Sequence, residues 1–92
     1  MDRDGVSVMS RNEFSVYQFS TEEMGNIQER VREFVDVGEA MRAFMHYTNN
    51  VAVKLGFTAR VIITDGGDYI VAEWKKGEGY TYPPELVKAN KK

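Results

Sequence analysis

Residues 59–74 read ARVIITDGGDYIVAEW, two runs of apolar and β-branched residues separated by a pair of glycines. Adjacent glycines supply the two positive φ angles that a type I′ turn requires, which predicts a β-hairpin with Gly66 and Gly67 as its loop. On one side of the sheet this register sets three pairs opposite each other: Ile63 and Ile70, Val61 and Ala72, and Ala59 and Trp74. We expect that side to pack against a helix, because it is apolar.

The other side of the same hairpin mixes polar and apolar residues. Its predicted pairs are Thr64 and Tyr69, Ile62 and Val71, Arg60 and Glu73, and Thr58 and Lys75. Arg60 and Glu73, which have opposite charges, lie across from each other in a register that the glycine pair alone defines. This agreement supports the register.

The preceding segment predicts a single helix over residues 37–55. Asp36 and Glu39 have the spacing of a capping box at the start. Gly56 and Phe57 fit a Schellman-type ending. Between these signals apolar or semi-apolar residues recur at alternating intervals of four and three and form one core-facing stripe: Val37, Met41, Phe44, Thr48, Val51 and Leu55.

The N-terminal half predicts another hairpin, with a strand over 13–20, a turn over 21–26 and a strand over 27–35. Near the C-terminus, residues 80–82 can resume the last strand beyond a bulge. The predicted fold class is α+β: a two-layer β-β-α-β-β arrangement, with a four-stranded, mostly antiparallel sheet and one helix packed on one face. The order of the strands in the sheet stays open.

Length and composition restrict the function. The 92 residues suffice for one domain, which we place at 13–87, between a flexible N-terminus (1–12) and a basic tail (88–92). Twelve basic against 14 acidic residues leave a net charge of -2, which does not indicate nucleic acid or anionic lipid. The absence of cysteine excludes disulfides and thiolate chemistry. Residues 1–12 lack an apolar signal-peptide core, and we expect a cytoplasmic protein without a membrane partner.

No residue pattern indicates catalysis, a metal or a cofactor. His46 is the only histidine, and within its helix only Arg42 and asparagines lie in reach, so no carboxylate orients it as a general base. Asp65 and Asp68 suit turn chemistry better than calcium binding. The Gly-Glu-Gly run at 77–79 lacks the strand and helix context of a phosphate loop. We therefore predict a protein that is not an enzyme.

The outward face of the second hairpin is the candidate binding surface. One helix covers one face of a sheet, so the other face is either covered by the terminal segments or buried against another molecule. The predicted partner-binding residues are Ile62, Val71, Tyr69, Arg60, Tyr80 and Tyr82.

These observations predict a small interaction or regulatory module that binds itself, as a homodimer, or a host protein. The alternative is a nucleic-acid-binding protein that uses Arg30, Arg32 and Arg60 with Tyr17 and Tyr69. Nearby acidic residues (Glu73, Asp65 and Asp68) disfavour that alternative, because they would repel phosphates. A small enzyme that uses His46 is the third hypothesis.

Three runs carry a resemblance: HYTNNV at 46–51, RVIITDGGD at 60–68 and EWK at 73–75. Over residues 27–83 the chain resembles small uncharacterised open reading frames of phage and proteobacterial genomes. Such proteins bring no known activity, so the resemblance assigns no site residue. It implies a phage-related protein that takes over or regulates host functions by binding.

Overall fold

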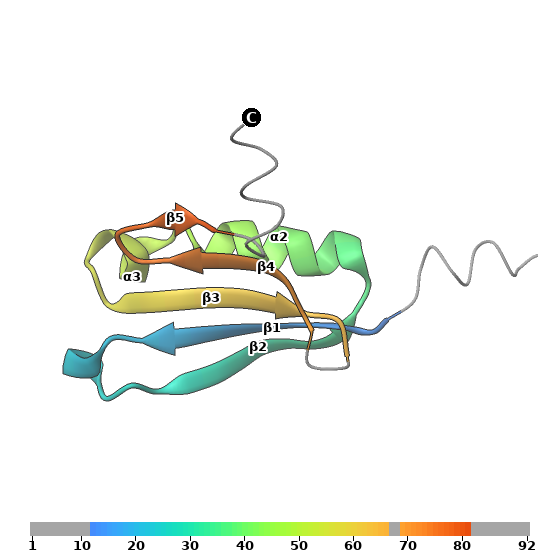
Figure 1. Ribbon diagram of the computed structural model, residues 1–92, viewed down its shortest axis with the longest axis horizontal. Helices are drawn as coiled ribbons and strands as arrows, with labels where there is room; N and C mark the ends of the chain where they lie inside the picture. Colours follow the sequence, from blue (N-terminus) through green and yellow to red (C-terminus); the bar gives the residue numbers. More distant parts are fainter. Residues whose placement is uncertain (1–11, 67–68, 82–92) are drawn as a thin grey trace, which may run out of the picture.

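An antiparallel sheet carries a helical layer on one face (Figure 1). The computed structural model describes residues 12–66 and 69–81. In sequence order the elements are β1 (Phe14–Ser20), η1 (Glu22–Met24), β2 (Gln28–Val35), α2 (Val37–Tyr47), α3 (Val51–Lys54), β3 (Thr58–Thr64), β4 (Ile70–Lys75) and β5 (Gly79–Tyr80). In the sheet the strands lie in the order β2-β1-β3-β4-β5.

The α+β class is confirmed, with a helix packed against an open antiparallel sheet, but the predicted number of strands is wrong. The described residues form five strands, because the chain reverses after β4 and adds β5 at the edge. Gly77 and Gly79 make this reversal possible with φ angles of 85° and 80°. The Glu78 N–H closes the turn by donating to the Lys75 carbonyl at 3.0 Å.

Parts of the predicted organisation lie outside the described residues. They comprise nearly all of the flexible N-terminus at 1–12, the basic tail at 88–92 and the domain limit at 87.

The start of α2 follows the sequence signal. The Asp36 carboxylate accepts from the Glu39 N–H at 2.7 Å and satisfies an amide that the helix leaves free. The Glu39 carboxylate does not complete a capping box. It lies 3.4 Å from Nε of Arg32 on β2 and ties the helix to the sheet.

The single helix predicted over 37–55 is wrong in its middle. α2 ends at Tyr47, and α3 begins at Val51, because the Asn50 side chain accepts from the Val53 N–H at 3.1 Å and caps a second helix. The predicted ending is confirmed, since Gly56 has a φ of 81° and the Phe57 N–H donates to the Ala52 carbonyl at 2.8 Å.

The second hairpin forms, but its register differs from the predicted one by two residues. The Asp65 N–H donates to the Tyr69 carbonyl at 3.0 Å, so the loop is one residue longer than a Gly-Gly turn. A bulge at Val71 adds the second residue, because Thr64 pairs with Ile70 while Ile63 pairs with Ala72. The loop and the bulge each add one residue. Because side chains alternate between the two sides of a strand, the residues of β4 beyond the bulge therefore keep their predicted side of the sheet.

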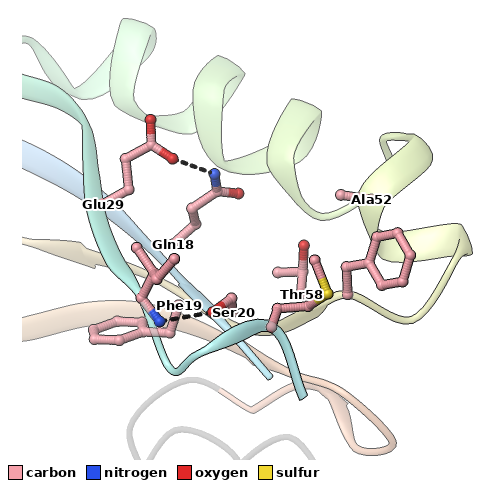
Figure 2. A pocket seen from close by; sticks show the side chains of 9 residues that line it. Gln18, Phe19, Ser20, Glu29, Ala52 and Thr58 are labelled. Carbon is pink, nitrogen blue, oxygen red and sulfur yellow. Dashed lines mark hydrogen bonds between the residues drawn. The ribbon is translucent and has the colours of Figure 1, made fainter. Parts of the chain in front are cut away.

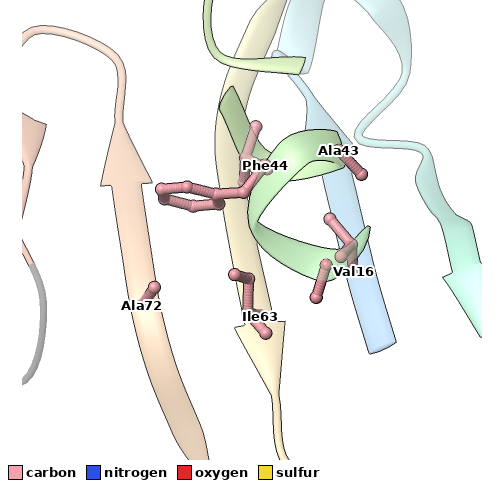
Figure 3. Packing of buried hydrophobic residues seen from close by; sticks show 7 residues of the cluster. Val16, Ala43, Phe44, Ile63 and Ala72 are labelled. Carbon is pink, nitrogen blue, oxygen red and sulfur yellow. The ribbon is translucent and has the colours of Figure 1, made fainter. Parts of the chain in front are cut away.

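The core lies between α2 and the two central strands, β1 and β3. Phe44, Val16, Val61 and Ile63 have no exposed surface. Figure 3 shows Phe44 reaching from α2 toward Ala72 on β4, with Ala43 on the side of Val16. The predicted inward position of Val61, Ile63 and Ala72 is therefore confirmed.

The edge strand β2 is irregular. Its pairing with β1 shifts twice, and Phe34 adopts a φ of 53°, which is uncommon for a bulky residue. The Phe34 N–H donates to the Ser15 hydroxyl at 3.1 Å, which holds the distorted backbone in place. Bulges and charged residues on an edge strand hinder edge-to-edge pairing with another sheet.

Candidate functional site

The candidate site is the sheet face opposite α2, which we call the open face. Two cross-strand rows define it, because residues that pair across antiparallel strands share a side. The first row contains Arg30, Tyr17, Ile62 and Glu73, on β2, β1, β3 and β4. The second row contains Gln28, Phe19, Arg60 and Lys75 on the same strands. In the part of the chain that the structure describes, both helices lie on the other side of the sheet.

Arginines stack on the two aromatic rings of the open face. The Arg30 guanidinium carbon lies 5.9 Å from the centroid of the Tyr17 ring, and that of Arg60 lies 5.3 Å from the Phe19 ring. Such cation–π contacts contribute roughly 0.5–1 kcal/mol at exposed sites. Each pair connects two neighbouring strands of the sheet.

Both arginines also have an acidic partner. Nε of Arg60 lies 2.5 Å from Oε2 of Glu73, whose Oε1 accepts from the Thr81 hydroxyl at 3.0 Å. Arg30 lies 3.4 Å from Glu33. The predicted Arg60–Glu73 ion pair therefore exists, although the strand residues are diagonal neighbours, because Ile62 lies directly opposite Glu73.

The aliphatic centre predicted for this surface is largely covered. Ile62 is on the open face, but only 6 % of it is exposed, and Tyr17 and Glu73 lie opposite it on the neighbouring strands. Val71 occupies the bulge of β4 and packs against the core cluster. The accessible part of the open face is therefore aromatic and charged.

Of the predicted tyrosines that the structure describes, Tyr80 does not lie on the open face. Tyr80 lies on the helix side, with its ring 5.8 Å from that of Phe44 and its hydroxyl 2.9 Å from the Thr48 hydroxyl oxygen. Its expected outward position is wrong because β5 pairs it with Trp74, which faces the core. Tyr69 is 59 % exposed beside the hairpin loop, and Tyr82 lies outside the described residues.

Residues of the first hairpin complete the site instead. Tyr17 and Arg30, which the nucleic-acid hypothesis combined, do share a face, whereas Arg32 points to the helix side and pairs with Glu39. No sequence motif marks Phe19 as a binding residue. Its spacing of two residues from Tyr17 on a predicted strand is the signal that places both rings on one side.

The other candidate groups are His46 on α2 and the two aspartates of the hairpin loop. His46 is exposed on α2, and its ring contacts that of Tyr47 edge-on at 4.7 Å between centroids. Among the described residues no carboxylate forms an ion pair or hydrogen bond with His46, and no three potential metal ligands cluster. Asp65 lies at the hairpin loop, while Asp68 is outside the described residues.

Comparison with protein-family models, with curated proteins and with solved structures found no match to this chain. Within 12–66 and 69–81, none of the helices has the length and apolar character needed to span a membrane.

Proposed function

We propose that the protein is a small non-enzymatic interaction module that binds another protein through its open face. The supporting observation is the pair of arginine-capped rings, Tyr17 with Arg30 and Phe19 with Arg60, on a face that neither described helix covers. Tyrosine and arginine are enriched among the residues that dominate protein–protein binding energies.

The ordering of these side chains favours a binding role. Glu73 forms an ion pair with Arg60, and the Thr81 hydroxyl donates a hydrogen bond to Glu73. These contacts orient the guanidinium before a partner binds. Fixing interface side chains in advance reduces the entropy lost on binding. The resemblance to phage reading frames favours a host protein as the partner.

The charges of the open face favour a protein over a nucleic acid. Glu33 and Glu73 partner the two arginines and would repel a phosphate backbone. Nucleic acid remains the second candidate, because stacking on two rings beside arginines is also how single strands bind. Gel retardation at low salt tests it: we expect no shift with single-stranded DNA or RNA, and a salt-dependent shift that requires Tyr17 would favour this candidate.

The main test uses a double variant, Tyr17→Thr with Phe19→Thr, which removes both rings and keeps residues that suit a strand. Met45→Gln is the matched control, because it removes an exposed apolar residue from α2 on the other layer. Proteins captured by the wild type would be identified, purified and titrated calorimetrically against all three forms.

We expect at least one purified partner to bind the wild type and the control equally and to bind the double variant at least tenfold more weakly. Equal binding to all three forms would rule out the open face. A concentration-dependent dimer that only the double variant loses would make a second copy the partner in place of another protein.

A further inference from the structure

A cavity of about 270 Å³ lies on the helix side of the sheet, where β1 ends, β2 begins and α3 passes over them. Phe19 of the open face also contributes to its lining. Nine residues line it: Gln18, Phe19, Ser20, Met24, Ile27, Glu29, Ala52, Phe57 and Thr58 (Figure 2). The interruption of the helix before α3 brings Ala52 rather than a large side chain over this part of the sheet.

The wall of the cavity is mostly apolar and opens to solvent. Met24, Ile27 and Phe57 line it and are 44 %, 60 % and 41 % exposed. Apolar side chains that are exposed together around a concave site are typical of ligand pockets. The rim therefore allows an apolar molecule to enter without unfolding the domain.

Gln18 gives the cavity one specific polar group. Its Nε2 donates to Oε1 of Glu29 at 2.9 Å, which fixes the orientation of the amide. Its Oε1 is buried and accepts no hydrogen bond from the described part of the chain. In Figure 2 this oxygen points away from Glu29. A buried acceptor without a donor is unfavourable, and in native proteins it calls for a specific explanation.

We propose that this cavity binds a small bicyclic aromatic molecule of about the size of indole, which donates one N–H or O–H to Oε1 of Gln18. A dry cavity of about 150 Å³ accommodates benzene, so about 270 Å³ suits two fused rings. The apolar wall selects for the rings, and the buried Oε1 of Gln18, which has no donor, selects for an N–H or O–H group. Among the described lining residues Glu29 alone is charged, and it disfavours an anionic ligand.

Amide NMR titration with indole and with indene separates the two parts of this proposal. Indene has the same fused-ring shape but no N–H donor. We expect both to shift the amides of Gln18, Ser20 and Thr58, with indole binding three to ten times more tightly, as one added hydrogen bond predicts.

Two variants with a control locate the site. Ala52→Leu fills the cavity and should abolish binding of both compounds, whereas Val51→Leu, on a neighbouring residue that is 68 % exposed and outside the lining, should leave binding unchanged. Gln18→Met keeps the side-chain length without the acceptor, and should bind indole and indene equally. If Gln18→Met does not fold, the two leucine variants still decide the location.

Three results would overturn the proposal. They are the absence of shifts at millimolar indole, shifts that Ala52→Leu leaves unchanged, and equal affinity of the wild type for indole and indene. Tighter binding of N-acetyl-tryptophanamide than of indole would also overturn it, since the cavity would then take a side chain of a protein.

Discussion

Replacing Phe44 by alanine tests the architecture of the core. Among the residues that the structure describes, Phe44 is the largest side chain with no exposed surface, and it projects from α2 into the space above β3 and β4. Truncation of a buried phenylalanine costs about 3–5 kcal/mol through lost transfer energy and the cavity left behind. Its ring also contacts Tyr80 at 5.8 Å between centroids, an arrangement that contributes roughly 0.5–1.5 kcal/mol in other proteins.

We therefore expect Phe44→Ala to lower the free energy of unfolding by about 4 kcal/mol. Small domains have roughly 5–15 kcal/mol in total, so the variant should fold but with a much lower denaturation midpoint. Urea unfolding followed by circular dichroism measures the difference, provided that the slope with denaturant is unchanged.

Met45→Ala is the control, because the neighbouring side chain is 47 % exposed. It should change the free energy of unfolding by less than about 0.5 kcal/mol. A loss below about 1.5 kcal/mol for Phe44→Ala, or equal losses for both variants, would show that α2 does not pack on the sheet through Phe44.

Three further predictions concern local features of the backbone and one hydrogen bond. Gly66→Ala should destabilise more than Gly77→Ala, because both have positive φ but only at Gly66 would the added Cβ lie 2.9 Å from a backbone oxygen, that of Glu13; equal losses in urea unfolding would contradict this steric reason. Asp36→Ala should cost about 1 kcal/mol by leaving the Glu39 N–H uncapped, and Asp36→Asn should restore most of it. Tyr80→Phe should cost about 1 kcal/mol through the lost hydroxyl contact with Thr48, whereas an unchanged thermal midpoint would place Tyr80 away from the helix.

The sequence predicts elements whose signals are local. Asp36 begins α2 by accepting from the Glu39 N–H, and Gly56 ends α3, where the Phe57 N–H donates to the Ala52 carbonyl; both signals act within a few residues. The inward positions of Val61, Ile63, Ala72 and Trp74 are also predictable, because beyond the bulge the alternation of apolar residues survives a register change of two. The predicted inward pairing of Ile70 with Ile63 is wrong, because Ile70 lies before the bulge and pairs with Thr64.

Features that depend on competition between signals are not predicted. Asn50 lies between Thr48 and Val51, inside the apolar spacing of one long helix, but it is also a good cap, and its local hydrogen bond from the Val53 N–H prevails. The bulge at Val71 and the turn after β4 change the positions of Val71 and Tyr80. The bulge and the turn depend on how side chains pack between the sheet and the helical layer, which the pattern along one strand does not show. A Gly-Gly pair does not specify the length of its loop.

The candidate site is predictable only in part. That a face is left without a helix follows from the number of elements, and Arg60 is placed there correctly. Its composition depends on the strand order, which brings β1 next to β3 and adds Tyr17 and Phe19. Strand order arises from long-range packing, so the tyrosines closest in sequence to the second hairpin do not predict the composition of the site.

The most direct test of the open face is an amide NMR titration of the labelled protein with the purified partner. Binding through this face predicts shifts that concentrate at Tyr17, Phe19, Arg30 and Arg60 and leave α2 and α3 unchanged. Shifts confined to α2, to α3 or to the cavity at Gln18 would contradict it.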